Sequence, residues 1–445
     1  MPVILIQTKT KIQVMKYIQL ILVFATFSII MSCNTKNTKQ VTDAKEYQAY
    51  LNIDQNKSLV NTKEELNFWA TKLSKTPNQY PYYFKMGVAN AQLFSLTGNI
   101  DKLKEAEKNL IEVNKRTNYN NASYLRGLAR NYISQHRFKE ALDLLLKAEK
   151  NAENLKQTHL MLVDVYLELG KTKQVEKYLS KVKNFKDFDY LIRISKYNDH
   201  LGNLENAILY LEDALQIVQT SNNKELLQWS YTNLADYYGH AGRIEDSYNA
   251  YLNALAINPN NSYAKKGIAW IVYSYERNPK EALRILNAVS EENASPDYYL
   301  LKSEIASFMG NIAEKETQEQ NYLEAISNEN YGVMYAKYNV LLFAETEDQK
   351  KKALEIAMQE VVERPTAQSY DLLAWSYYNN GQVEKALEIS EKHVIDKTFE
   401  PEALLHTAYI LKANDKQNEA NVLKQELLGA VYELGPLAEG VINNI

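Results

Sequence analysis

Apolar residues recur at three- and four-residue spacing along most of the chain, which is the periodicity of amphipathic helices. From residue 122, one apolar face marks a first helix and then a second, at Leu125, Leu128, Ala129, Tyr132, Phe138, Ala141, Leu145 and Ala148. The same pattern restarts at residue 156, thirty-four residues later. Only 14 glycines and nine prolines occur in 445 residues, too few for a β-fold with many turns. We therefore predict an all-α fold.

The helical pattern repeats as a unit. Small or β-branched residues return nineteen residues after the start of successive units, at Ala141, Val175, Ala207, Ser247, Ala353, Ala386 and Ala420. Units begin at or near residues 84, 122, 156, 188, 228, 262, 296, 334, 367 and 401. Self-similarity at this period predicts a solenoid, in which each helical hairpin covers the apolar face of the next. Glycines such as Gly170 and Gly242 are expected to end first helices, and Pro259 and Pro365 to end second helices.

The clearest unit, residues 228–261, resembles a tetratricopeptide repeat. Large apolar residues stand at positions 4, 7 and 11 of that family's pattern and small ones at 8, 20 and 27, here Tyr231, Leu234, Tyr238, Ala235, Ser247 and Ala254. The resemblance covers roughly residues 80–434. It implies a right-handed α-α superhelical solenoid over residues 61–445, with about nine repeats and capping helices at both ends.

Two irregularities interrupt the period. The step from residue 188 to residue 228 is forty residues, which predicts a longer pair of helices there. Near Arg277 one extra residue enters the unit before Ala282. Such insertions are either tolerated drift or the edge of a binding surface.

In tetratricopeptide proteins the first helix of each unit lines a concave groove. Carrying that rule over gives these candidate partner-binding residues: Arg126, Arg130, Lys196, Trp229, Asp236, Trp270, Asp371, Trp375, Tyr378 and Tyr409. Tryptophan, tyrosine and arginine dominate binding energy at protein interfaces. The alternative is that the large rings pack against the neighbouring repeat, and the sequence leaves both interpretations open.

The first residues predict an export signal. Met15 and Lys16 precede an apolar run over residues 17–31, too short to cross a bilayer comfortably, since a spanning helix needs roughly twenty residues. Cys33 is the only cysteine, and with Ile30, Met31 and Ser32 it resembles the lipobox of bacterial lipoproteins. That resemblance implies cleavage before Cys33 and its lipidation. We therefore expect a signal peptide at 1–32, working from Met15, and a lipidated, flexible tether at 33–60.

The net charge and the residues after Cys33 limit the classes of partner and the location that we expect. Removing residues 1–32 deletes three lysines and no acid, so the formal charge changes from −4 to −7, which argues against nucleic-acid binding. No acidic residue directly follows Cys33, whereas some outer-surface lipoproteins carry such residues. We expect an anchor in the bacterial cell envelope, in the outer membrane and facing the periplasm.

The sequence contains no pattern typical of an enzyme. The six histidines lack metal-ligand spacing, one cysteine excludes disulfides and cysteine-ligated zinc, and no phosphate loop or nucleophile elbow is present. We expect no enzyme activity, no cofactor and no metal. The predicted function is a membrane-anchored scaffold that binds a protein or extended peptide in its groove. The alternative is a substrate-binding lipoprotein of an outer-membrane nutrient-uptake or secretion system, although the large insertions typical of that family are not visible.

Overall fold

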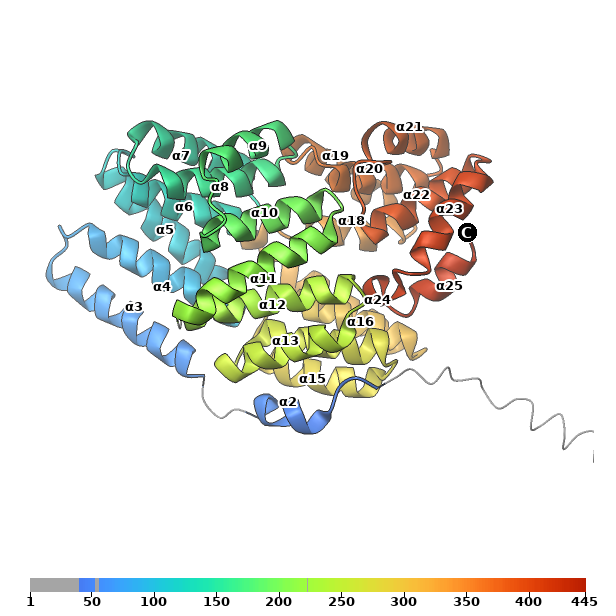
Figure 1. Cartoon of the computed structure of the whole chain (residues 1–445), viewed down its shortest axis with the longest axis horizontal. Helices are drawn as coiled ribbons and strands as arrows, with labels where there is room; N and C mark the ends of the chain where they lie inside the picture. Colours follow the sequence, from blue (N-terminus) through green and yellow to red (C-terminus); the bar gives the residue numbers. More distant parts are fainter. Residues whose placement is uncertain (1–39, 53–55, 222) are drawn as a thin grey trace, which may run out of the picture. The chain divides into compact units, whose positions relative to one another are not determined.

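Helices make up the regular structure of this chain (Figure 1). The computed structural model describes residues 40–52, 56–221 and 223–445, and no strand occurs within these ranges. Val41–Ile445 form one unit of the fold. The predicted signal peptide and the lipidation site Cys33 lie outside the described residues.

Ten successive helical hairpins occupy residues 81–427 of the described chain. They pair α4 (Pro81–Thr97) with α5 (Ile100–Arg116), α6 (Ala122–Ser134) with α7 (Phe138–Asn151), α8 (Leu155–Glu168) with α9 (Thr172–Lys181), α10 (Phe188–His200) with α11 (Leu204–Ser221), α12 (Lys224–His240) with α13 (Ile244–Ile257), α14 (Ser262–Trp270) with α15 (Pro279–Glu292), α16 (Asp297–Phe308) with α17 (Ile312–Ile326), α18 (Ala336–Ala344) with α19 (Lys350–Glu363), α20 (Ala367–Asn379) with α21 (Val383–His393), and α22 (Pro401–Ala413) with α23 (Gln417–Leu427). Consecutive hairpins contact one another, the α16–α17 and α18–α19 hairpins through Tyr322 and Asn339, so the predicted all-α solenoid is confirmed.

Further helices lie at both ends and between hairpins. They are α2 (Ala44–Leu51) and α3 (Lys57–Lys75) before the first hairpin, the π-helix η1 (Ile271–Tyr275) after α14, the 3-10 helix η2 (Glu329–Tyr331), and α24 (Val431–Leu434) and α25 (Ala438–Asn443) after the last hairpin. α3 packs against α4, and α25 packs against α23. These contacts cover the two ends of the stack.

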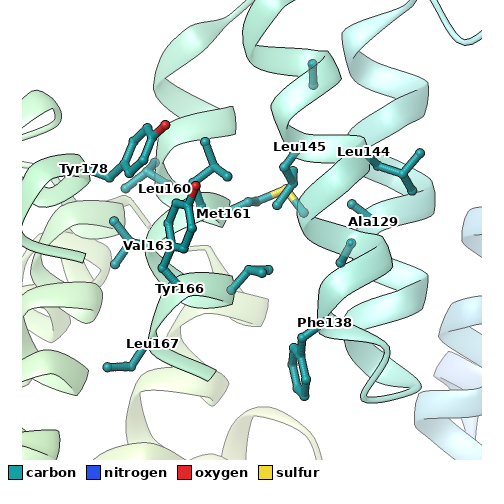
Figure 2. Close-up of a cluster of buried hydrophobic side chains, with 14 of the residues drawn as sticks. Ala129, Phe138, Leu144, Leu145, Leu160, Met161, Val163, Tyr166, Leu167 and Tyr178 are labelled. Carbon is teal, nitrogen blue, oxygen red and sulfur yellow. The ribbon is translucent and has the colours of Figure 1, made fainter. Parts of the chain in front are cut away.

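Small side chains allow the helices of neighbouring hairpins to approach closely. In the cluster of Figure 2, Ala129 of α6 and Ala141 of α7 are fully buried, and Leu145 and Leu160 fill the space beside them. The same cluster takes residues from α8 and α9, including Tyr178. One apolar core is thus shared by two hairpins, and its burial at interior density stabilises the stack.

The π-helix η1 accommodates the extra residue that the sequence places near Arg277. α14 ends at Trp270, and the next five residues form a wider turn before Arg277 takes a left-handed conformation with φ +59. A π-turn absorbs a single inserted residue without ending a helix, and such turns are frequent at functional sites. The forty-residue step is absorbed differently, by the longer helices α11 and α12.

The segment expected to be a free tether is partly folded. α2 packs against α13 and α15, with Tyr47 only 2% exposed and its hydroxyl donating to Glu281 at 2.7 Å. Asp43 caps the helix by accepting from the amide of Lys45. Residues 41–51 therefore belong to the solenoid, and α3 already begins at Lys57. The expectation of a flexible segment over 33–60 is wrong in both places. The polar composition hid a short amphipathic helix whose apolar residues, Tyr47 and Leu51, are four residues apart.

Hairpins far apart in sequence also touch one another. The amide of Ala294, between α15 and α16, donates to the carbonyl of Thr97, at the end of α4, at 2.8 Å. At the turn after α8, Gly170 has φ +65, and a Cβ there would lie 2.9 Å from the carbonyl oxygen of Pro365. The chain thus folds back on itself, with the turn after α8 against the segment between α19 and α20.

Replacing Gly170 with alanine tests this contact. The positive φ alone costs about 1–2 kcal/mol for a residue with a Cβ, and the clash with the Pro365 backbone adds about 1–3 kcal/mol. The matched control is Gly381→Ala, because Gly381 has φ +76 with no atom within 4 Å of the added Cβ. Urea denaturation should show a larger loss of unfolding free energy for Gly170→Ala than for Gly381→Ala. Equal losses would contradict the close approach.

Candidate binding cavity

The first helices of several hairpins border a cavity with two adjoining regions. Region 1 is lined from α8, α10, α18, α20 and the start of α22, and region 2 from α12, α14, α16 and α24. Each has a volume of about 540 Å³, and both include the side chains of His240, Lys337, Glu402 and Glu433. Cavities of this size commonly hold ligands.

Region 1 contains an ion cluster that joins distant hairpins. Glu168 of α8 accepts hydrogen bonds from Lys196 Nζ of α10 at 2.9 Å and from Arg364 Nη2, after α19, at 2.6 Å. Burial opposes ionisation of Glu168, but the charges of Lys196 and Arg364 outweigh it and lower its pKa. Lys196, a predicted groove residue, therefore lines the cavity with its charge already paired.

Asp371, a second predicted groove residue, is 4% exposed and lines region 1 from α20. Its Oδ2 atom accepts a hydrogen bond from Nδ1 of His406, on α22, at 2.9 Å. Burial raises the pKa of Asp371, and although burial acts against protonation of His406, the carboxylate raises the pKa of the imidazole. Oδ1 of Asp371 is buried and has no hydrogen-bond partner among the described residues.

Three predicted aromatic residues cluster beside His406, and one of them, Trp375, contacts it directly. The Trp375 ring stacks on that imidazole, with centroids 4.2 Å apart and planes 12° apart. Tyr378 stacks on Trp375 at 5.0 Å, and Tyr409 meets it edge-on at 6.4 Å. These rings pack between α20 and α22 and support the His406 side chain instead of lining either region.

Region 2 combines a carboxylate with aromatic rings. Asp236 of α12 accepts hydrogen bonds from the hydroxyls of Tyr251 at 2.5 Å and Tyr263 at 2.7 Å. Trp270, at the end of α14, lines the same region and donates from Nε1 to the carbonyl oxygen of Tyr432 at 3.1 Å. Two more predicted groove residues, Asp236 and Trp270, are thus brought together.

Glu304 of α16 completes the wall of region 2. Burial raises the pKa of its carboxyl to about 7, and the hydroxyl of Tyr273, which donates to Oε1 at 3.1 Å, opposes this only in part. No ion pair joins Glu304 to a basic side chain within residues 40–52, 56–221 and 223–445. Its charged form is therefore poorly compensated.

The short helix α24 closes one side of region 2. Its Tyr432 carbonyl oxygen accepts hydrogen bonds from both Trp270 and Ser274, the latter at 2.7 Å. Glu433 pairs with Nδ1 of His240 at 2.7 Å. Burial acts against protonation of His240, but the hydrogen bond and charge of Glu433 outweigh it and raise the pKa of the imidazole to about 9. A charge pair thus fastens α24 to α12.

The remaining predicted groove residues lie outside both regions. Arg126 of α6 donates to the carbonyl of Glu153 at 3.0 Å and to the hydroxyl of Thr158 at 3.1 Å. Arg130 of the same helix is exposed. Trp229 of α12 is 39% exposed and meets Phe188 edge-on. The cavity borders do not extend to these three side chains.

A comparison with family models matches the tetratricopeptide repeat at residues 230–261, which cover most of α12 and all of α13. The chain contains a tetratricopeptide repeat. A search of the curated proteins finds no match. Among the residues that the structure describes, no helix is long and apolar enough to span a bilayer.

Several solved structures of helical proteins resemble the chain at low identity. The human IFIT1 dimer with m7Gppp-AAAA is 15% identical, with 74% of this chain and 75% of that chain covered and a TM-score of 0.46. A Rap protein complexed with Competence and Sporulation Factor is 14% identical, with 62% and 88% covered and a TM-score of 0.42. Yeast Tom70 is 13% identical, with 86% and 92% covered and a TM-score of 0.35. Identities this low say nothing of function.

Some cavity residues were missed although the repeat positions point to them. Tyr263 and Lys266 occupy positions 2 and 5 of the unit from residue 262, and Glu304 occupies position 9 of the unit from residue 296. The predicted groove residues include only Trp270 from the unit at residue 262 and none from the unit at residue 296. Arg364 and Tyr432 reach the cavity from segments outside any first helix, and no repeat position identifies them.

The His240–Glu433 pair predicts a pH dependence of stability. The imidazole has a raised pKa in the folded state, so its stabilising effect is fully present below the unfolded pKa of about 6.5. That effect disappears as the pH rises through about 9. The melting temperature of the unchanged protein should fall more between pH 6.5 and 9.5 than that of His240→Gln. Parallel curves for the two proteins would contradict the pairing.

Proposed function

We propose that this chain is a bacterial lipoprotein, anchored through Cys33, whose solenoid holds a protein or an extended peptide in the cavity. The observation that carries the proposal is the cavity itself, bordered by first helices and lined by ionisable and aromatic side chains. Such side chains supply both the directional contacts and the buried area that peptide recognition needs. The lining of the two adjoining regions extends from residues of α8 to residues of α16.

In this proposal the lipid anchor fixes the protein to a membrane, and the cavity binds the partner. Two acyl chains on Cys33 would hold the protein at a membrane, because each buried methylene contributes about 0.8 kcal/mol. The lipobox-like residues before Cys33 and the export signal support an envelope location, and we place the protein at the outer membrane, facing the periplasm. The solenoid then recruits its partner to that surface as a scaffold.

Cys33→Ser tests the anchor. Without the sulfur that accepts the lipid, the chain should leave the membrane fraction and keep its signal segment, which mass spectrometry of the intact protein would detect. The unchanged chain should stay with the membranes through an alkaline wash. If the variant is retained as firmly as the unchanged chain, the lipid anchor is wrong.

Site-directed photo-cross-linking tests the cavity. Tyr263 lines region 2 and is 55% exposed, so p-benzoylphenylalanine at this position should cross-link the partner in cells. The matched control is the same replacement at Tyr80, which is 39% exposed and outside both regions. The expected result is one protein cross-linked from position 263 and not from position 80. Capture from position 80 alone would place the partner elsewhere and contradict the proposal.

A further inference from the structure

Region 2 holds more negative than positive charge. Its three basic side chains are each paired with an acid: Lys266 with Asp297, Lys337 with Glu402 at 2.7 Å, and His240 with Glu433 at 2.7 Å. The carboxyl groups of three other lining residues form no ion pair with a basic side chain in the described part of the chain, namely Asp236, Glu304 and Glu400. An anion entering region 2 would therefore meet unpaired carboxylates and, among the described side chains that line it, no unpaired basic group.

Aromatic rings line the same space as these carboxylates. Trp270, Tyr251, Tyr263 and Tyr432 all border region 2. The faces of such rings carry partial negative charge and attract ammonium and guanidinium groups. Rings and carboxylates in one cavity favour a ligand that is both cationic and partly apolar, such as the side chain of lysine or arginine.

The two best-placed carboxyl groups are partly buried and form no ion pair in the described part of the chain. Asp236 accepts hydrogen bonds from the hydroxyls of Tyr251 and Tyr263, and burial raises its pKa, which the more distant charges of His240 and Lys266 offset only in part. Glu304 accepts only the hydroxyl of Tyr273, and burial raises its pKa to about 7. A carboxylate that is partly withdrawn from water and has no ion-pair partner is costly to ionise. A cation supplied by a ligand would remove that cost, so binding and ionisation would favour each other.

Region 1 adds an independent observation. Asp371 is 4% exposed and lines the cavity, and its Oδ1 atom is buried without a hydrogen-bond partner among the described residues. Buried carboxylate oxygens almost always accept a hydrogen bond. Because Glu400 and Glu402 border both regions, carboxylates follow the cavity wall from Asp371 to Glu304. A ligand with several spaced donors would fit this series.

We propose that the cavity recognises lysine or arginine side chains of a basic peptide, with Asp236 and Glu304 as the main counter-charges in region 2. The inference rests on the proposed function and specifies its ligand. The shared chemistry is an alkylammonium or guanidinium group held between carboxylates and aromatic faces. A peptide fits better than a small amine because the carboxylates extend through both regions, whereas a single amine occupies only one position.

Fluorescence anisotropy with the purified full chain tests the ligand class. A short fluorescein-labelled peptide that alternates lysine and serine should bind, and a peptide with glutamate in place of lysine should not. The double variant Asp236→Asn with Glu304→Gln keeps the shape of both side chains and should raise the Kd for the lysine peptide about tenfold or more. Glu388→Gln is the matched control, since Glu388 is exposed on α21, outside both regions, and its loss should leave the Kd unchanged. Thermal melting checks that each variant is folded.

The other outcomes are equally informative. Binding of spermidine that competes with the lysine peptide and depends on Asp236 and Glu304 supports the cation site, and a spermidine affinity above that of the peptide would assign it to a small amine. Equal binding of the two peptides, binding of neither, or an unchanged Kd in the double variant would overturn the inference. If position 263 still cross-links a protein partner in that case, the scaffold proposal stands and only its charge selectivity is wrong.

Discussion

The contact between the end of α8 and the segment after α19 is the constraint on which the cavity depends. Repeats of a solenoid contact mainly their neighbours in sequence, and such a stack can stay open. Here Arg364 pairs with Glu168, and the backbone of Pro365 lies against Gly170. The side chains of the ion pair are 23% and 26% exposed, so solvent screens the attraction only in part. Both contacts lie beside region 1, which residues of α8 and α20 line.

The charged groups that line the cavity differ in whether an opposite charge lies beside them. Acidic and basic side chains form ion pairs where segments far apart in sequence come together. Glu168 pairs with Arg364, and Glu433 of α24 pairs with His240 of α12. Where the wall is built from α12, α14 and α16, Asp236 and Glu304 meet only phenol hydroxyls. Low-dielectric surroundings strengthen an ion pair, and the same surroundings make a carboxylate without an ion-pair partner costly. The structure thus holds paired charges at its closures and uncompensated acids at the wall of region 2.

Much of the fold could be predicted because its determinants are local. Five hairpins begin at the residues that the repeat pattern predicts, and their first helices start at Ala122, Phe188, Ser262, Ala367 and Pro401. Four of these helices are capped by the residue just before them, such as Asn121 and Asp187, whose side chain accepts a hydrogen bond from the third helical amide. The sequence did not predict α2 because the contacts that stabilise this helix are not local. Its two buried apolar residues, Tyr47 and Leu51, pack against α13 and α15, far along the chain.

The candidate site was predictable only in part. Lys196, Asp236, Trp270 and Asp371 reach the cavity because first-helix positions face it by repeat geometry. Arg126, Arg130 and Trp229 occupy equivalent positions, but the cavity borders do not extend to the parts of α6 and α12 that carry them. Position within a repeat sets the direction of a side chain. The curvature of the whole stack sets whether anything lies opposite it.

The sequence by itself determined the helices, their period and their small-to-large packing, because each depends on residues within one or two hairpins. It also indicated which positions of a first helix face the groove. Only the tertiary structure decided that α24 lies against Trp270 and Ser274, that Arg364 meets Glu168, and that Asp236 and Glu304 face one cavity. Those contacts join residues 158 to 196 positions apart or come from separate repeats. They depend on the summed rotation from one hairpin to the next, which no single repeat encodes.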